Sequence, residues 1–527
     1  MRSILPLILA CCLLCPCTHA QQKEDSSALG MVASAHPLAT EAGRRMLREG
    51  GNAFDAITAV SFMLAVVEPS MSGLGGRLQA IWQLPDGTVS GMDATTQVPA
   101  SYLKRQKEEE NGFGTIGVPG MVKGITEMHK RYGRLPLKTV IRPAIEAADK
   151  GHSLHADESR RQSLELKELR RFSATARHFL PKDTVAAGGS LFRQPALASA
   201  LKMIAKDGGR SFYSGSIGYA LAREVTEGGG FLTMSDMEAY RAGDARILRG
   251  HYRGYEILGM GLPCYGAIVI EMLQMLEQTD LSGCSEADFL LRHAAVHYKA
   301  YEDRPLLKTI EDTLVRPSFA RKRWADSVPA GMLPPTPADT ADHANGHTTH
   351  LVASDRYGNV VSLTQSLGPL MGSKVASARY GFMLATTMGP YLGAMKAGDR
   401  AASHISPILV LKDGRPVMAL GAAGGARIVP AIVQVISRHI DQGMPIAAAL
   451  AAGRVYQMPD RLLLENHKGV TWKDNRTPER IRAAVRKTDE VRSPAQFGRV
   501  HALLRLPDGT WVGAADPDWS GTAAGVD

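Results

Sequence analysis

The feature that most constrains the fold is an abrupt change of pattern around residue 346. Residues 120–320 are mostly helical in pattern, with Gly or Pro near the ends of the apolar periodic segments. Residues 328–346 are rich in proline and glycine and poor in large apolar residues, which predicts a linker or exposed loop. After this segment the apolar residues follow a period of two in short paired runs. Such a chain is expected to pair strands into sheets and to cover them with helices.

Turn signals divide the chain into short segments. We expect helices over residues 38–49, 53–67, 121–132, 137–150, 195–207, 217–227, 287–301 and 428–442. We expect strands over residues 31–34, 78–84, 89–92, 350–354, 360–366, 408–411, 417–420 and 503–506. Residues 23–28 are polar and are expected to form a loose N-terminal segment.

Residues 1–20 differ from the rest of the chain. Arg2 precedes a short apolar run, and Thr18, His19 and Ala20 precede a polar stretch that begins at Gln21. This pattern predicts a secretory signal at 1–20, and hence a periplasmic or secreted protein. A lipoprotein box ending at Cys11 is the alternative. No later stretch is long enough to predict a membrane span.

The sequence gives no reason to expect a metal or a cofactor. Four of the six cysteines lie within 1–20, which leaves Cys264 and Cys284, and two cysteines cannot build a metal cage by themselves. A single disulfide between them stays open. His343, His347 and His350 would share one helix face, but a glycine interrupts any helix there.

The formal net charge of +9 raises the possibility of a polyanion partner. The densest basic stretch covers residues 160–171 and is interleaved with glutamates at helical spacing. Mixed charges at this spacing predict a solvated helix face rather than a phosphate-binding track. We therefore expect no nucleic-acid partner.

Thr348 is the residue that most invites a catalytic interpretation. It follows the predicted linker and opens a predicted buried strand. If the chain were cut before Thr348, a free α-amine would lie beside the threonine hydroxyl, and an α-amine titrates near neutral pH. One residue would then supply both nucleophile and base. The alternative is that Thr348 is an ordinary strand residue, since threonine is common in strands.

A glycine-rich segment at 421–427 joins a predicted strand to a predicted helix. Turns of this kind aim backbone N–H groups at an anion, either a dinucleotide phosphate or an oxyanion. The glycine spacing does not match the dinucleotide-binding fingerprint. A tight turn required only for packing is the other interpretation.

Several motifs taken together resemble the γ-glutamyltranspeptidase family, whose members are also called glutathione hydrolases. The resemblance spans nearly the whole chain after residue 20. Its motifs are GMVASAHPLAT at 30–40, GGNAFDA at 50–56, LGG at 74–76, VPG at 118–120, YRGY at 252–255, YEDR at 301–304, TTH at 348–350 and DRYGN at 355–359.

The resemblance implies an α+β fold, the four-layer αββα sandwich of N-terminal-nucleophile hydrolases. It implies a precursor that cuts itself before Thr348, giving a large subunit 21–347 and a small catalytic subunit 348–527 that together form one domain. Thr348 would form an acyl-enzyme with a small-molecule amide. Ser366 matches a hydroxyl residue that bonds to the nucleophile, and Gly424 and Gly425 match the oxyanion-hole pair.

The substrate pocket departs from the family pattern. Ser403 and His404 occupy the positions of two serines that contact the substrate carboxylate. Thr95 replaces the arginine that clamps this carboxylate, Gly368 replaces an asparagine, and Pro390 replaces the acidic residue that binds the α-amine. Burying both charges of a zwitterion without partners is costly, so the acyl specificity is expected to be altered.

Arg77 follows the LGG motif, where the family usually has a small or acidic residue. It either binds a substrate carboxylate from a new direction or is a surface arginine on a loop.

The leading hypothesis is a self-processing amidohydrolase or acyltransferase that cleaves γ-glutamyl amides such as glutathione, or a related small acyl amide. The alternatives are a hydrolase of other acyl amides, such as glutaryl amides, and a non-catalytic relative used for binding.

Overall fold

The computed structural model describes residues 23–103, 109–325, 346–467, 469–493, 496–518 and 520–527. The predicted signal at 1–20 and nearly all of the predicted linker at 328–346 lie outside these residues.

Two seven-stranded sheets form the centre of the molecule. Sheet A has the order β1 (Glu24–Ser27), β18 (Trp511–Ala515), β17 (Arg499–Arg505), β13 (Arg415–Ala423), β12 (Ile408–Lys412), β9 (Tyr255–Met260) and β8 (Ile247–Tyr252). Sheet B has the order β19 (Thr522–Gly525), β2 (Gly30–Ser34), β10 (Gly346–Asp355), β11 (Val360–Pro369), β3 (Arg77–Gln83), β4 (Val89–Ala94) and β7 (Gly243–Asp244). Neighbouring strands in both sheets are antiparallel.

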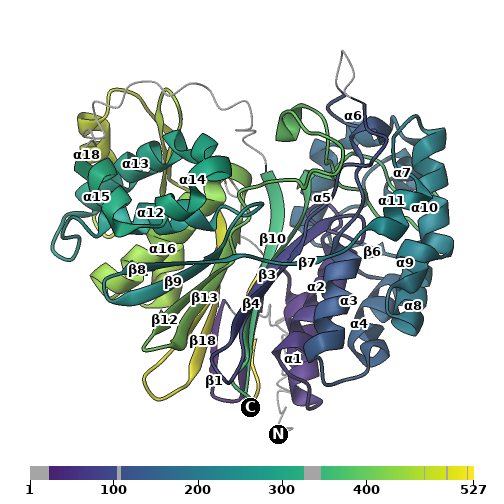
Figure 1. The fold of residues 1–527 in the computed structure, drawn as a ribbon, viewed down its shortest axis with the longest axis horizontal. Helices are drawn as coiled ribbons and strands as arrows, with labels where there is room; N and C mark the ends of the chain where they lie inside the picture. The colour runs from purple at the N-terminus through teal and green to yellow at the C-terminus, as the bar shows by residue number, and fades with distance from the viewer. Residues whose placement is uncertain (1–22, 104–108, 326–345, 468, 494–495, 519) are drawn as a thin grey trace, which may run out of the picture.

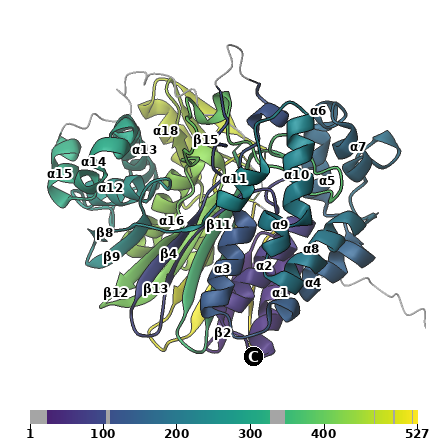
Figure 2. The ribbon, with the colours of Figure 1, turned by 45° about the vertical axis from the view of Figure 1, so that its right-hand side comes forward.

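Helices cover the outer face of each sheet (Figures 1 and 2). The layer on the side of sheet B contains α1 (Pro37–Arg48), α2 (Ala53–Val67), α3 (Met121–Tyr132), α4 (Leu137–Lys150), α5 (Ala156–Leu164), α6 (Leu166–Leu169), α7 (Ser173–Phe179), α8 (Pro195–Asp207), α9 (Arg210–Ser214), α10 (Ser216–Glu227) and α11 (Met234–Ala239). The layer on the side of sheet A contains α12 (Gly266–Leu276), α13 (Glu286–Glu302), α14 (Leu307–Leu314), α15 (Pro317–Ala325), α16 (Ile428–Gln442), α17 (Ile446–Ala451) and α18 (Thr477–Ala484).

Smaller elements complete the fold. Strands β14 (Val455–Gln457), β15 (Leu462–Glu465) and β16 (Thr488–Val491) form a three-stranded sheet, and β5 (His152–Ser153) pairs with β6 (Leu191–Phe192). Short 3₁₀ turns are η1 (Phe113–Thr115), η2 (Pro181–Asp183), η3 (Arg304–Leu306), η5 (Pro390–Leu392) and η6 (Gly425–Arg427).

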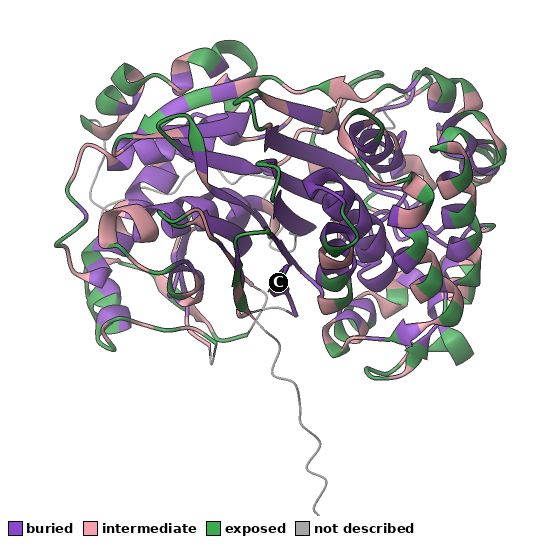
Figure 3. Ribbon diagram, turned by 90° about the horizontal axis from the view of Figure 1, so that it is seen from below, coloured by how far each residue is buried: buried purple, intermediate pink, exposed green. Residues whose placement is uncertain are grey.

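Three apolar cores hold the layers together. One core packs the outer helices onto sheet B, another packs α12, α13 and α16 onto sheet A, and a third lies between the two sheets. Figure 3 shows buried residues through the sheets and exposed residues on the outer helices. This layering confirms the expected αββα sandwich, since apolar faces of sheets and helices must cover one another.

Helix α2 shows why several sequence boundaries could be predicted. All fifteen of its residues are buried, as its apolar composition requires. Asn52 and Asp55 form a capping box at its first turn. The Ala53 N–H donates to the Asp355 carboxylate at 2.7 Å, which ties the helix to the β10–β11 turn.

The polar segment after residue 22 is not loose, contrary to expectation. Glu24–Ser27 form β1, which pairs with β18. Ser27 is buried, and its hydroxyl donates to the Val526 carbonyl. Backbone hydrogen bonds to β18 hold this strand, so its polar side chains gave no sequence signal for a strand.

Among the described residues, no helix is both long enough and apolar enough to cross a membrane.

The two cysteines left open by the sequence are both free thiols. Cys264 is buried and Cys284 is half-buried.

Candidate active site

The junction between His347 and Thr348 lies at an irregular point in β10. Thr348 pairs with Ser366 and His347 pairs with Gly368, so Leu367 has no partner across the ladder. This irregularity is a β-bulge, a feature that bends a strand and re-aims its side chains. Thr348 is buried, and the strand begins at Gly346 rather than at residue 350 as expected.

The Ser366 hydroxyl connects the two sides of this junction. It donates to the His347 carbonyl at 2.8 Å and accepts from the Gly368 N–H at 2.9 Å. Its oxygen lies 3.0 Å from Thr348 Oγ1. Because Ser366 has one proton and gives it to the carbonyl, the Thr348 hydroxyl is the donor to Ser366. The Ser366 hydroxyl therefore polarises the His347 carbonyl by donating to it, and its oxygen accepts a hydrogen bond from the Thr348 hydroxyl.

Arg77 extends the row formed by Thr348 and Ser366. Strand β3 pairs Arg77 with Ser366, so the three side chains share one face of sheet B. This face looks toward sheet A, because Ile81 and Val352, an even number of residues along their strands, belong to the core between the sheets. Arg77 is only 1% exposed, which rules out a surface arginine on a loop.

Gly424 and Gly425 form the turn between β13 and η6. Their φ angles are +138° and +59°, a region that favours glycine. A Cβ atom on Gly424 would lie 2.9 Å from Gly498 Cα. Strand β13 passes close to β10, since a Cβ atom on Gly421 would lie 2.4 Å from the His350 ring. The glycine pair thus lies at the end of sheet A that faces the Thr348 strand.

Ser403 and His404 precede β12. They lie near the same strand ends of sheet A as the glycine pair, because the start of β12 pairs with the last part of β13. Burial, with smaller contributions from Arg304 and His297, holds the pKa of His404 well below its usual range. His404 is therefore neutral near pH 7 and cannot act as a cationic clamp.

The three altered pocket positions have no charged side chains. Thr95 is buried after β4, and its N–H donates to the Asp93 carboxylate at 3.0 Å. Gly368 has a φ of +92° on β11, and Pro390 begins η5. Arg400 binds the same Asp93 carboxylate at 3.1 Å. The Asp93 carboxylate thus already binds the Thr95 N–H and the Arg400 guanidinium.

A buried charge network under the neighbouring residue was missed at the sequence level. Thr349 donates to Glu68 at 3.2 Å, and Arg161 binds Glu68 at 3.2 Å and Glu158 at 2.7 Å. All four side chains are buried. The prediction of a solvated helix face at 160–171 was therefore wrong for Arg161, because Glu68, one of its two partners, lies far away in the sequence. The available signal was Glu68 at the end of an apolar helix.

One group of side chains is close enough to hold a cation. Ligand atoms of Glu465, His467 and Asp518 lie within 4.8 Å of one another. However, the Gly469 N–H donates to His467 Nδ1 at 3.2 Å, which places the ring proton on Nε2, facing Glu465 at 3.3 Å. Arg454 also binds Glu465 at 2.8 Å. The group is best explained as a hydrogen-bonded ion cluster.

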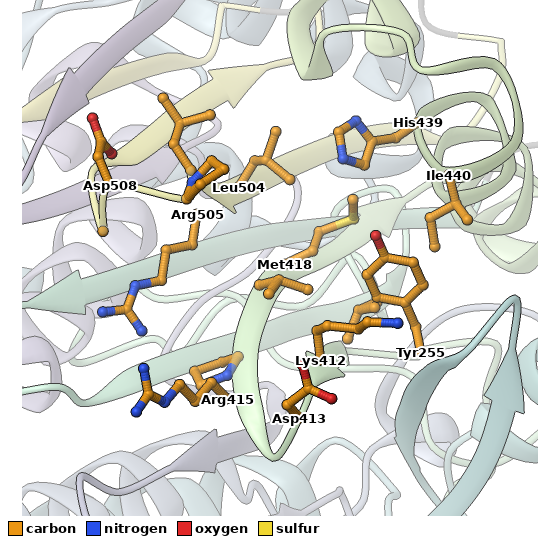
Figure 4. A pocket seen from close by; sticks show the side chains of 16 residues that line it. Tyr255, Lys412, Asp413, Arg415, Met418, His439, Ile440, Leu504, Arg505 and Asp508 are labelled. Carbon is orange, nitrogen blue, oxygen red and sulfur yellow. The ribbon is translucent and has the colours of Figure 1, made fainter.

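A surface groove of about 750 Å³ lies at the other end of β13 (Figure 4). Its lining includes Tyr255, Lys412, Arg415 and Arg505. The nine residues of β13 run from Arg415 at the groove to Ala423, which is about 26 Å at the usual rise per residue. The groove is therefore separate from the Thr348 site.

Comparison with known proteins shows the family of the chain. The family model described as Gamma-glutamyltranspeptidase matches residues 39–526. The Glutathione hydrolase proenzyme of Escherichia coli (strain K12) is 29% identical, over 93% of this chain and 90% of its own. The Acylase ACY 1 proenzyme of Pseudomonas sp. (strain V22) is 32% identical, over 94% of this chain and 93% of its own.

Two solved structures are also similar to this chain. Cephalosporin acylase from Bacillus halodurans has a TM-score of 0.88, with coverage of 96% and 98%, and at 24% identity it supports the fold alone. Helicobacter pylori gamma-glutamyltranspeptidase is 29% identical, with a TM-score of 0.53 and coverage of 56% and 90%. The chain belongs to the γ-glutamyltranspeptidase family, as a divergent member of this group of self-processing N-terminal-nucleophile hydrolases and acyltransferases.

Proposed function

We propose that the chain cuts itself between His347 and Thr348 and that the new N-terminal Thr348 cleaves small acyl amides. The products of the cut are a large subunit 21–347 and a small catalytic subunit 348–527. The observation that carries this proposal is the Ser366 hydroxyl, which bonds to the His347 carbonyl and lies 3.0 Å from Thr348 Oγ1. A nucleophile, a proton acceptor and a polarised carbonyl then lie at one junction.

The self-cleavage follows from this hydrogen-bond arrangement. Thr348 Oγ1 attacks the His347 carbonyl carbon. Its proton passes to the Ser366 oxygen while Ser366 gives its own proton to the carbonyl oxygen. The C–N bond then breaks as the carbonyl re-forms, and the proton released from this oxygen passes to the nitrogen, which becomes the α-amine of Thr348. Water hydrolyses the resulting ester, which releases the carboxylate of His347 and restores the threonine hydroxyl.

The mature reaction uses the same hydroxyl on an external amide. The α-amine of Thr348 takes the hydroxyl proton, since its pKa lies near neutrality. The oxygen attacks the substrate carbonyl, and the proton passes to the leaving amine. The N–H groups of Gly424 and Gly425 would stabilise the oxyanion, a contribution of about 10²–10³ in rate per donor. Water or an acceptor amine then takes the acyl group from Thr348.

The acyl group that fits best lacks the α-amine of a γ-glutamyl group. With Thr95, Gly368 and Pro390 in the pocket, neither charge of an amino-acid zwitterion has its family partner. Arg77 on sheet B and the Ser403–His404 pair on sheet A remain as binding groups for a single carboxylate. We therefore propose glutaryl-type acyl amides as substrates, with γ-glutamyl amides such as glutathione as the second candidate. Both a glutathione hydrolase and an acylase occur among the relatives.

We also propose export through the segment 1–20, which places the enzyme in the periplasm or outside the cell. Mass spectrometry of the exported large subunit should find Gln21 at its N-terminus. A lipid-modified Cys11 or Cys12 would contradict this processing.

A denaturing gel tests the central proposal and separates it from a non-catalytic relative. Purified wild-type protein should give two bands, and N-terminal sequencing of the smaller band should begin at Thr348. Active wild-type protein that stays as one intact band would refute the mechanism.

A further inference from the structure

Arg499 is a buried cation that begins β17 on sheet A. It is 3% exposed and pairs with Ala423, the residue that precedes the glycine turn. Its side chain lies on the same side of β17 as that of Leu503, four residues later, since side chains alternate along a strand. Leu503 belongs to the core between the two sheets. The Arg499 side chain therefore faces sheet B, which carries Thr348.

The strand register brings Arg499 close to Thr348. His501 pairs with Gly421, and a Cβ atom on Gly421 would lie 2.4 Å from the His350 ring. Burial lowers the pKa of His350 well below its usual range, and the nearby His501 ring lowers it further. His350 and His501 are thus neighbours across the two sheets. Thr348 and Arg499 each lie two residues earlier on the same sides of their strands, so they face each other beside the glycine turn.

The charge of Arg499 reaches the junction that is to be cut. Burial lowers the pKa of His347 well below its usual range, and Arg499 is the charged group that adds most to this shift. Arg161, Lys374 and Arg160 add smaller contributions of the same sign. These four cations disfavour protonation of any base at the junction. Arg499 itself is charged near pH 7, since burial lowers its pKa only to about 10.

The acidic groups around the junction each bind a basic or histidine side chain. These pairs are Glu68–Arg161 at 3.2 Å, Glu158–Arg161 at 2.7 Å, Glu165–Lys374 at 2.9 Å, Asp516–Arg454 at 2.9 Å and Asp518–His467 at 3.5 Å. Three of these acids, Glu68, Asp516 and Asp518, also help to keep Arg499 protonated.

The histidines near the junction are neutral at pH 7. Burial lowers the pKa of His350, His404 and His501. On sheet B, Arg77 lies in the same row as Thr348. Positive charge therefore approaches Thr348 from both sheets, from Arg499 on sheet A and from Arg77 on sheet B.

A new base is formed at this point when the chain is cut. Before the cut, the Thr348 nitrogen belongs to a peptide bond and does not titrate. After the cut it is an α-amine, whose ordinary pKa is about 7.7–8.0, and only its neutral form can take the hydroxyl proton. An ordinary α-amine is mostly protonated at pH 7. Burial and nearby positive charge both disfavour the protonated form.

We propose that Arg499 is a positioning residue that keeps the α-amine of mature Thr348 neutral near pH 7. The proposal rests on the proposed function, because the amine exists only after the cut. Arg499 needs no contact with the substrate, since a charge in the protein interior acts over several ångströms with little screening. Without this charge the amine should bind a proton at a higher pH, and activity should be lost as the pH falls through this higher value.

Chemical labelling measures the amine directly. Mature protein is treated with a trace of acetic anhydride at several pH values, and hydroxylamine then removes any ester on the Thr348 hydroxyl. Mass spectrometry of the N-terminal peptide of the small subunit gives the acetylated fraction, because only the neutral amine reacts. The pKa of the wild-type amine should lie below the ordinary range, and in Arg499→Met it should rise by about one unit. Arg499→Gln should show the same rise, and Arg499→Lys, which keeps the charge, should behave like the wild type.

The pH dependence of kcat gives a second measurement. With glutaryl p-nitroanilide, the acidic limb of the profile should move to higher pH in Arg499→Met by the same amount. At a pH well below the pKa of the amine, kcat should therefore fall about tenfold, while kcat at alkaline pH and KM stay near the wild-type values. Arg505→Met is the matched control, because Arg505 lies on the same side of β17, about 20 Å further along the strand. It should shift neither the amine nor kcat.

The outcomes separate this proposal from the proposed function. A wild-type amine that titrates in the ordinary range would overturn the role of Arg499 without any variant. A rise in Arg499→Lys as large as in Arg499→Met, or a rise confined to Arg77→Met, would also overturn it. Each of these results in a cut protein leaves the proposed function standing. A chain that stays uncut would refute both.

Discussion

The proposed reaction centre and the proposed acyl-binding loops of this protein differ in how far they follow the family. Thr348, Ser366, Gly424 and Gly425 match the residues to which the resemblance assigns the chemistry. Thr95, Gly368 and Pro390 replace the residues to which it assigns the γ-glutamyl head group. The first set is fixed by strand register and by a glycine turn with no room for a side chain. The second set lies at strand ends and in loops, where substitution disturbs less of the fold. Chemistry and specificity can therefore diverge separately.

The largest effect should come from the nucleophile. Thr348→Ala removes the hydroxyl, so the precursor should stay uncut and hydrolyse no anilide. Thr348→Ser keeps a hydroxyl and a free amine and should still give two bands, although more slowly. The measurement is a denaturing gel followed over hours. Cleavage in the alanine variant would place the reaction centre elsewhere.

Removing the bridging hydroxyl should slow the cut without abolishing it. Ser366→Ala deletes the donor to the His347 carbonyl, and we expect self-cleavage to slow by about 10²–10³. Ser366→Thr keeps the hydroxyl and should cut within about tenfold of the wild-type rate. Time courses with freshly purified precursor give both rates. Equal rates for the alanine and threonine variants would show that this hydroxyl has no chemical role.

The choice of acyl group tests the difference between the two regions most directly. We expect kcat/KM on glutaryl p-nitroanilide to exceed that on the γ-glutamyl compound by about tenfold or more. Each charge-assisted hydrogen bond to a charged head is worth about 1.5–3 kcal/mol. Initial rates with the mature enzyme measure the ratio. A tenfold preference for the γ-glutamyl compound would mean that an unidentified residue binds the α-amine.

A methyl group at the glycine turn should damage catalysis more than folding. Gly424→Ala places Cβ 2.9 Å from Gly498 Cα at a φ of +138°, so the N–H groups of the turn must move. We expect kcat to fall about 10- to 100-fold. Gly443→Ala is the control, because its φ is +64° but no atom lies within 4 Å of the added Cβ. It should cost about 1 kcal/mol of stability and leave kcat unchanged.

The smallest expected effect is the pH dependence of KM. Burial and Arg304 keep the pKa of His404 well below 6.5, so His404 stays neutral from pH 6 to pH 8. The KM for glutaryl p-nitroanilide should therefore be flat over this range. A cationic His404 would instead lose its charge as the pH rises through its pKa, and KM would rise. Steady-state kinetics at several pH values distinguish the two.

The sequence predicted the layers because they depend on local signals, and the proposed reaction centre stays a prediction. The apolar run with a capping box gave α2 its boundaries, 53–67, and alternation gave the strands on both sides of the 355–359 turn. Thr348 drew attention because it follows a proline-rich segment and lies near the start of β10, which begins at Gly346.

Long-range pairing explains what the sequence could not predict. The polar strand β1 exists because β18 supplies its hydrogen bonds from nearly five hundred residues away. Arg161 is buried between Glu158 on its own helix and Glu68, which follows α2.

The strand order of the two sheets has a consequence for how the protein reaches its mature form. Each sheet interleaves strands from both sides of the His347–Thr348 junction, and β10 lies between β2 and β11. The precursor must therefore fold as one chain before the junction can form. Once it is cut, refolding from the denatured state would require two chains to find each other and would depend on concentration. After cleavage, unfolding is therefore hard to reverse, and the lifetime of the enzyme is set by its unfolding rate.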